Sequence, residues 1–241
     1  MSKFNRVDEA LLPYFYRMTI RSTVLLSCII FLAPGCLPTL STNFETARML
    51  ASKTWEVQGN CSSYQGVLNS SKLAEWGNKT NNYGLSVAYG LTSKIRLRAR
   101  FENIVLKDRV EFFNGPILPP GSRVQYSEFG IKFGWNQHRK MRAAFSLPLG
   151  IITHQEETFG YITPTLYASY ARNDKFEVGV NGKVHYWFHG STAVPWVSTG
   201  IVFGLSQNLK KWALRTEINS DIYNISLGIG FSYLISPFKT R

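Results

Sequence analysis

The sequence has few of the features that mark helical membrane proteins or charged soluble domains. Beyond the N-terminal region no apolar run approaches the roughly 20 residues that a membrane helix needs. Charged residues make up only 17% of the 241 residues, and the mean hydropathy is −0.10. The chain therefore does not cross a membrane with several helices. A barrel is compatible with these values, because alternating apolar and polar positions average the hydropathy toward zero.

Cysteine and metal-binding patterns are also scarce. Three cysteines, one of them inside a hydrophobic leader, are too few for a disulfide framework; they are Cys28, Cys36 and Cys61. The four histidines are dispersed along the chain, at His138, His154, His185 and His189. No glycine-rich phosphate loop, His-Glu-His pattern or paired-cysteine motif occurs. We therefore expect no metal site and no cofactor.

The net charge of +12 raises the question of an anionic partner. The most basic short segments are 138–140 and 210–211, and both fall in predicted turns. No aromatic platforms on which bases could stack lie between them. We therefore predict no nucleic-acid partner.

Strict alternation is the dominant pattern, and it is clearest in residues 223–234, YNISLGIGFSYL. Its odd positions are apolar or aromatic, whereas its even positions are small or polar. Residues 83–91, YGLSVAYGL, repeat this pattern. Period-2 alternation predicts strands, and bulky faces that end in tyrosine are typical of strands facing lipid.

The alternation continues over about ten strands, most of 9–13 residues, which is the length that a tilted membrane-spanning strand requires. The predicted strands are 55–64, 83–91, 95–103, 128–135, 143–151, 159–170, 176–188, 197–205, 212–219 and 223–234. We predict an all-β fold, a single up-and-down antiparallel transmembrane β-barrel, with eight or twelve strands as alternatives. The last strand should close the barrel against the first, and Pro148 should cause a local bulge.

The connections alternate between short turns and longer loops. Short turns follow residues 91, 135, 172 and 206, whereas the longer loops are 65–81, 107–121 and 189–195. Outer-membrane barrels have short turns on the periplasmic side and longer loops outside. With ten strands both termini lie on the periplasmic side.

The charged positions of the strands share one face. This face should point into the lumen, because a Lys or Arg facing lipid at the midplane costs roughly 2–4 kcal/mol. The predicted lumen charges are Arg96, Arg98, Arg100, Glu102, Glu128, Lys132, Glu177, Lys183, Arg215 and Glu217. We expect the three arginines to be paired with the four glutamates. Such a network either fills and stiffens the barrel or lines a narrow, anion-preferring pore.

The N-terminal region has the composition of an export signal. Arg21 precedes an apolar stretch at 24–32, and Cys36 follows Ala33, Pro34 and Gly35. This resembles a bacterial lipoprotein signal, whose processed cysteine carries lipid. Ordinary cleavage nearby or an uncleaved anchor are the alternatives. We predict a signal peptide over 1–35 (with 1–17 as an over-long start), a periplasmic spacer with a helical turn over 36–53, and a barrel over 54–236.

On these patterns the chain resembles small bacterial outer-membrane β-barrel proteins and lipoproteins over residues 55–235. The resemblance implies a barrel in the bacterial outer membrane, in contact with its lipid. We expect a structural or partner-binding role through loops 65–81 and 107–121, with another envelope protein or a surface ligand as the partner. A narrow anion pore is the alternative, and a soluble lipocalin-like barrel ranks last.

One short motif raises an enzymatic alternative. His189-Gly190-Ser191 is similar to the H-x-S pair of outer-membrane lipid A deacylases, in which the histidine activates the serine. The asparagine expected after the serine is replaced here by Thr192. His189 and Ser191 are therefore weak catalytic candidates, and we expect no enzymatic activity.

Overall fold

The structure is a computed structural model that describes residues 42–66, 78–111, 117–137, 140–155, 157–189, 192–221 and 224–236. The predicted signal segment 1–35 and Cys36 lie outside these residues, so cleavage and lipidation stay predictions. In the described ranges no helix is both long and apolar enough to cross a membrane, a finding that concerns helices alone.

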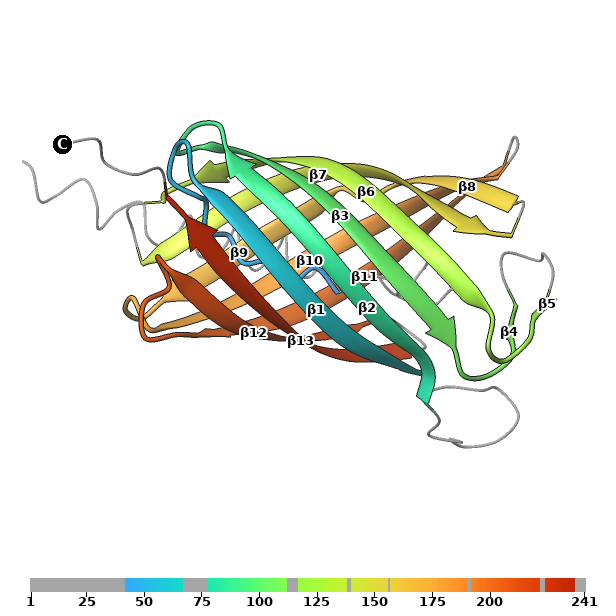
Figure 1. Cartoon of the computed structure of the whole chain (residues 1–241). Helices are drawn as coiled ribbons and strands as arrows, with labels where there is room; N and C mark the ends of the chain where they lie inside the picture. Colours follow the sequence, from blue (N-terminus) through green and yellow to red (C-terminus); the bar gives the residue numbers. More distant parts are fainter. Residues whose placement is uncertain are drawn as a thin grey trace, which may run out of the picture. The chain divides into compact units, whose positions relative to one another are not determined.

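The described residues are almost entirely strands joined by turns. The strands are β1 (Trp55–Gly66), β2 (Asn78–Gly90), β3 (Ile95–Leu106), β4 (Val110–Glu111), β5 (Ile117–Leu118), β6 (Arg123–Trp135), β7 (Met141–His154), β8 (Glu157–Ile162), β9 (Thr165–Ala171), β10 (Phe176–His189), β11 (Thr192–Leu205), β12 (Trp212–Ser220) and β13 (Asn224–Ile235). The main strands lie side by side and tilted, whereas β4 and β5 form a small separate hairpin (Figure 1).

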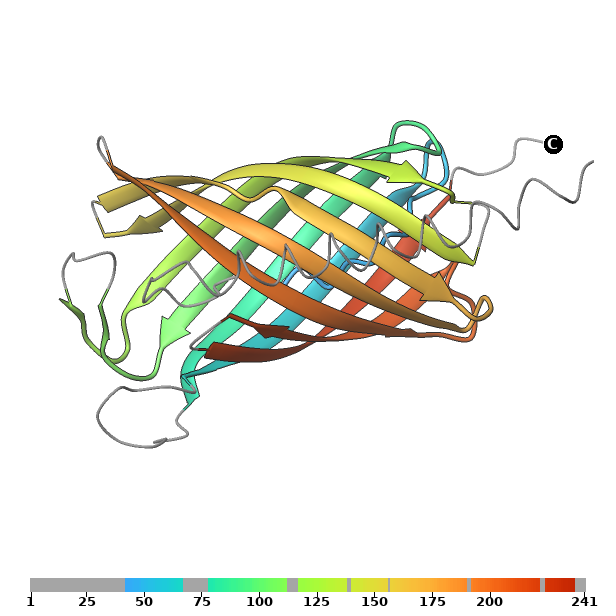
Figure 2. The ribbon, with the colours of Figure 1, turned by 180° about the vertical axis from the view of Figure 1, so that it is seen from behind.

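The main sheet closes on itself as an antiparallel barrel. β8 and β9 both pair with β7 and with β10, so they are two halves of one strand interrupted at Thr163 and Pro164. Counting them once gives the ten predicted strands, and pairing of β10 with β11 completes the ring. β1 pairs with β13 from Trp55↔Ile235 to Gly66↔Asn224, which confirms the predicted closure. Figure 2 shows the opposite wall, formed by β7 to β11.

Two local predictions were wrong. Pro148 causes no bulge: it pairs in register with Gly130, and its carbonyl accepts a hydrogen bond from the Thr163 amide at 3.0 Å. The interruption falls instead on the neighbouring strand, where Pro164 has no amide hydrogen to donate. The predicted loop 189–195 is mostly strand, since β10 extends to His189 and β11 begins at Thr192.

The outer wall of the barrel is apolar. Large hydrophobic side chains that are 36–60% exposed occur on the main strands, among them Leu85, Phe101, Phe129, Leu149, Leu166, Val180, Ile201, Ile229 and Phe231. Exposed aromatic residues stand near the short-turn end at Trp55, Trp135, Tyr170 and Tyr233, and near the other end at Tyr186 and Phe188. An apolar band bounded by aromatic residues is the surface of a transmembrane barrel.

The half of the lumen nearer the short turns contains a segment of the chain itself. Residues 42–50, which we call the lumen segment, run along the inside of the barrel before the chain turns into β1. Phe44 and Ala47 are completely buried, and Phe44 packs against Gly228 and Gly230 of β13. Residues 42–50 of the predicted spacer thus lie in the lumen and form no helical turn, whereas residues 51–53 are exposed. The domain boundaries themselves stay predictions.

The other half of the lumen is packed with apolar and aromatic side chains. All are at most 5% exposed and they form one cluster: Ile104, Leu106, Leu118, Val124, Tyr126, Ile152, Phe159, Tyr161 and Trp187. Leu118 belongs to the hairpin β4–β5, so the loop between β3 and β6 is anchored in this cluster. The described residues therefore fill both halves of the interior, as is usual for narrow barrels.

The contact between Phe44 and β13 can be tested by adding one methyl group. In Gly228→Ala the new Cβ would lie 2.4 Å from Phe44 Cζ and 2.7 Å from Ser62 Cβ. We expect the free energy of unfolding in detergent, measured by urea titration, to fall by about 1–3 kcal/mol. Gly182→Ala is the matched control, because its Cβ meets nothing within 4 Å. Equal stability of the two variants would contradict the packing of Phe44 against β13.

Candidate functional site

The candidate site is the ion-pair network inside the barrel, and Glu45 of the lumen segment is at its centre. Glu45 Oε1 lies 3.1 Å from Arg96 Nη2 and 3.5 Å from Arg98 Nη1. Glu45 Oε2 lies 3.5 Å from Lys132 Nζ and accepts a hydrogen bond from the Tyr167 hydroxyl at 3.1 Å. One carboxylate therefore contacts three cations from two neighbouring strands, β3 and β6.

Strand pairing explains why these cations meet. Arg96 and Lys132 are directly opposite each other in the β3–β6 ladder, and Arg98 is two residues further along the same face. Like charges at such spacing repel, so the cluster requires a carboxylate between them. Lys132 Nζ also lies 4.2 Å from the centre of the Tyr167 ring, a cation–π contact.

Barrel side chains also hold the backbone of the lumen segment. Lys132 Nζ donates to the Thr46 carbonyl at 2.6 Å, and Arg98 Nη2 donates to the Asn43 carbonyl at 3.3 Å. Gln137 Nε2 donates to the Ala47 carbonyl at 2.9 Å, and its Oε1 accepts from the Met49 amide at 3.0 Å. The segment is thus held in the way that a protein binds an extended peptide.

A second group of ion pairs joins β1, β3 and β12. Glu56 of β1 accepts from Arg96 Nη2 at 2.7 Å and from Arg215 Nη1 at 2.8 Å. Arg100 pairs with Glu102 on its own strand, and its Nη1 donates to Asn43 Oδ1 at 2.7 Å. All these charged side chains are buried, so each carboxylate offsets part of the desolvation cost of its arginine partners.

Three further ion pairs extend the network around the barrel. Lys183 Nζ lies 3.2 Å from Glu217 Oε1, both side chains are fully buried, and Glu217 also accepts from the Phe44 amide. Glu177 pairs with Arg48 of the lumen segment at 3.1 Å and with Arg142 at 3.5 Å. The lumen segment is therefore tied to β10 and β12 as well as to β3 and β6.

All ten charged residues that the sequence assigned to the lumen are buried, none more than 7% exposed. Their partners differ from the expected ones. Only Arg100 pairs with one of the four glutamates, whereas Arg96 and Arg98 contact Glu45, and Arg96 also contacts Glu56. Glu128 instead accepts hydrogen bonds from the hydroxyls of Tyr126 at 2.7 Å and Tyr161 at 3.4 Å.

Sequence reasoning missed Glu45 and Glu56 as members of the site. Glu56 alternates with the outward-facing Trp55 and Val57, so its inward direction follows from the β1 pattern. Glu45 belongs to a segment with no alternation, and no local signal marks it. Its position depends on the shape of the closed lumen.

The structure tests little of the predicted catalytic pair and of the histidines. Ser191 lies outside the described residues, as does the side chain of His189, so this pair stays a prediction. His185 is buried between the hydroxyls of Thr163 at 3.1 Å and Ser198 at 3.0 Å. Within the part of the chain that the structure covers, no group of three or more His, Cys, Asp or Glu residues could hold a metal ion.

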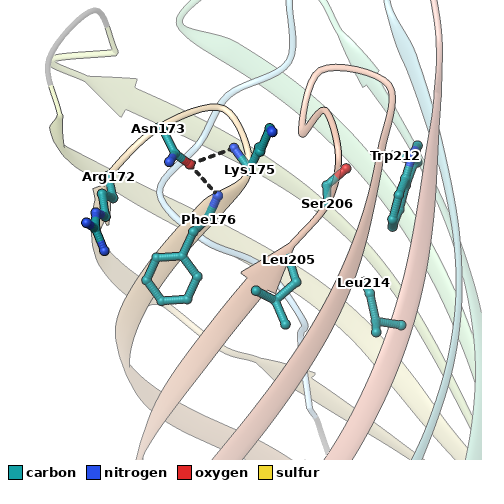
Figure 3. Close-up of a pocket in the computed structure, with 8 residues that line it drawn as sticks. All are labelled: Arg172, Asn173, Lys175, Phe176, Leu205, Ser206, Trp212 and Leu214. Carbon is teal, nitrogen blue, oxygen red and sulfur yellow. Dashed lines mark hydrogen bonds between the residues drawn. The ribbon is translucent and has the colours of Figure 1, made fainter.

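A separate groove of about 440 Å³ lies at the short-turn end of β10, β11 and β12 (Figure 3). The residues that line it are Arg172, Asn173, Lys175, Phe176, Leu205, Ser206, Trp212 and Leu214. Asn173 Oδ1 fixes the turn by accepting hydrogen bonds from the amides of Lys175 and Phe176, both at 2.9 Å. Beside it, a hydrogen bond from Lys210 at 2.9 Å lowers the pKa of Asp174 below its ordinary value. Apolar walls under basic turn residues suit the boundary between lipid tails and headgroups.

No protein-family model matches the chain, and no curated protein matches its sequence. Similar solved structures include an outer membrane channel from Pseudomonas putida F1, with 8% identity over 81% of this chain and 99% of that chain, at a TM-score of 0.47. The NanC porin shares 8% identity over 73% of this chain and 98% of that chain, at a TM-score of 0.45. The outer membrane protease OmpT from Escherichia coli shares 12% identity over 80% of this chain and 100% of that chain, at a TM-score of 0.42.

These three proteins are a channel, a porin and a protease. At such identities and TM-scores the similarity carries no argument about the role of this chain.

The buried pair Lys183–Glu217 provides a test of the network. Lys183→Met leaves Glu217 charged and buried beside the Phe44 amide. We expect the free energy of unfolding to fall by about 3–5 kcal/mol, because a buried charge loses its partner. The double variant Lys183→Met/Glu217→Gln should lose less than the sum of the two single variants.

The matched control is the exposed pair Lys210–Asp174, whose side chains are 69% and 56% exposed. Asp174→Asn should cause only a small loss, because solvent and salt screen this pair. If Lys183→Met is as mild as Asp174→Asn in urea titrations, the lumen pair does not hold the interior together.

Proposed function

We propose that the chain is a bacterial outer-membrane β-barrel protein with periplasmic termini that binds its partner through its surface loops and has no open pore through its lumen. In this proposal the barrel is a rigid, lipid-embedded support. The segments around 65–81 and 107–121 contact another envelope protein or a surface ligand. Outer-membrane lipid surrounds the apolar belt.

The filled interior is the observation that supports this role. The lumen segment and its ion pairs occupy the short-turn half, and the apolar cluster around Tyr126 and Trp187 occupies the other half. A solute could pass only if both the lumen segment and the apolar cluster moved. A barrel whose interior is packed in this way is suited to anchoring and display.

The position of the two largest connections agrees with a binding role. Between β1 and β2, and between β3 and β6, the chain leaves the barrel at the end opposite the short turns. Lys107, Asp108 and Arg109 are exposed there. Leu118 anchors the same connection in the apolar cluster, so this loop has a fixed base and charged exposed positions.

A narrow anion-preferring pore is the second candidate. Arg96, Arg98 and Arg100 form a row along the inner face of β3. This row would line a passage only in a state that the lumen segment has left. In such a pore, the state in which residues 42–50 occupy the lumen would be the closed, resting state.

Conductance distinguishes the two candidates. The full-length protein is reconstituted into planar lipid bilayers beside a general porin as the positive control. We expect no conductance steps over the voltage range at which the porin conducts, because the lumen is filled. Reproducible single-channel steps from the unmodified protein would contradict the closed-support role and favour the pore.

The loop role is tested with a photo-activatable cross-linking amino acid at position 108, between β3 and β4. In intact cells we expect one discrete adduct from this position. The control places the same amino acid at Lys94, an exposed position in the short turn between β2 and β3. Equal labelling from both positions, or none from position 108, would contradict loop-mediated binding.

A further inference from the structure

The contacts of Glu45 have the form of a ligand bound in a receptor site. Its carboxylate is buried at 4% exposure and lies among two guanidinium groups, one ammonium group and one phenol hydroxyl. Arg96 and Arg98 lie within ion-pair distance of Oε1, which accepts no hydrogen bond from the described residues, whereas Oε2 accepts hydrogen bonds from Lys132 and Tyr167. Guanidinium and ammonium groups in such an arrangement are the usual partners of a carboxylate.

The cations of this site depend on Glu45 to different degrees. Arg96 has a second carboxylate partner in Glu56 at 2.7 Å. Among the described residues, Glu45 is the carboxylate that forms an ion pair with Arg98 and with Lys132. Glu128 also borders the site, but tyrosine hydroxyls donate to it. Removing Glu45 therefore leaves two buried cations without their ion-pair partner, which is unfavourable in a lumen of low polarity.

The site has no room for a second anion while Glu45 is present. The cavity beside it, bordered by Asn43, Glu128, Lys132, Ser146 and Tyr167 among others, measures about 10 Å³. That is about the space of one water molecule. An external carboxylate can enter only if the side chain of Glu45 leaves.

We propose that Arg96, Arg98, Lys132 and Tyr167 form a carboxylate-binding site, and that Glu45 occupies it as an internal ligand. The external ligand is a small solute with a carboxylate group. Its binding competes with the lumen segment, so the site couples recognition of the solute to the position of residues 42–50. The proposal is independent of the loop role, because it concerns only the interior.

Replacing Glu45 with alanine creates a cavity that acetate should fill. Glu45→Ala removes one methylene and the carboxylate, and acetate contains the same heavy atoms. The full-length variant is refolded into detergent in sodium acetate or in sodium chloride of equal ionic strength. The folded fraction is measured from its altered gel mobility, and the midpoint of thermal unfolding is measured for the folded protein.

We expect acetate to raise the unfolding midpoint of Glu45→Ala by at least about 2–4 °C over chloride, because a ligand of the native state shifts the equilibrium. The unmodified protein and Glu45→Gln, whose side chain still fills the site, should show no difference between the salts. Glu45→Ala/Lys132→Met should show a smaller shift than Glu45→Ala. If Glu45→Ala does not fold in chloride, acetate should restore the folded band.

Three results would overturn the proposal. The first is an acetate effect on Glu45→Ala no larger than that on the unmodified protein. The second is equal stabilisation by inorganic phosphate at matched ionic strength, which would show an unspecific anion effect instead of a carboxylate site. The third is a Glu45→Ala variant that fails to fold equally in acetate and chloride.

Discussion

The structure depends on the pairing of buried charges inside a narrow barrel. Ten lumen residues predicted from the sequence, together with Glu45 and Glu56, carry charge and are almost completely removed from solvent. Each unpaired charge in such an environment would cost several kcal/mol. The barrel can therefore close only if strands and lumen segment bring opposite charges together. Glu45 meets this requirement for Arg98 and Lys132, which are neighbours on β3 and β6.

This constraint connects the interior to the exterior. Lipid on the outside selects the large apolar side chains of Leu85, Phe101 and Phe129, and alternation then sends every charged neighbour inward. The small residues of β13 have a related role. Gly228 and Gly230 leave space for Phe44, so the strand that closes the barrel also seats the lumen segment.

The sequence predicts the wall of the barrel better than its contents. Period-2 alternation located the ten strands and the outward apolar belt, because both depend on residues adjacent in a strand. The closing pair β1–β13 followed from the up-and-down order of these strands. The partners of Arg96 and Arg98 were not predictable, since Glu45 is about 50 residues away in a segment without periodicity. The apolar cluster was missed for another reason. At Ile104 and Ile152 apolar residues continue on the inner face beyond the predicted strand ends, so polarity no longer separates the two faces.

The central claim is that residues 42–50 occupy the lumen and hold its charges in balance. Hydrogen–deuterium exchange of the full-length protein in detergent, followed by mass spectrometry of the peptide that covers these residues, tests it directly. The account predicts slow exchange, close to that of peptides from β3 and β6, because the segment is buried and its Phe44 and Met49 amides donate hydrogen bonds to Glu217 and to Gln137 Oε1. Exchange within seconds, at the rate of an unstructured peptide, would contradict it.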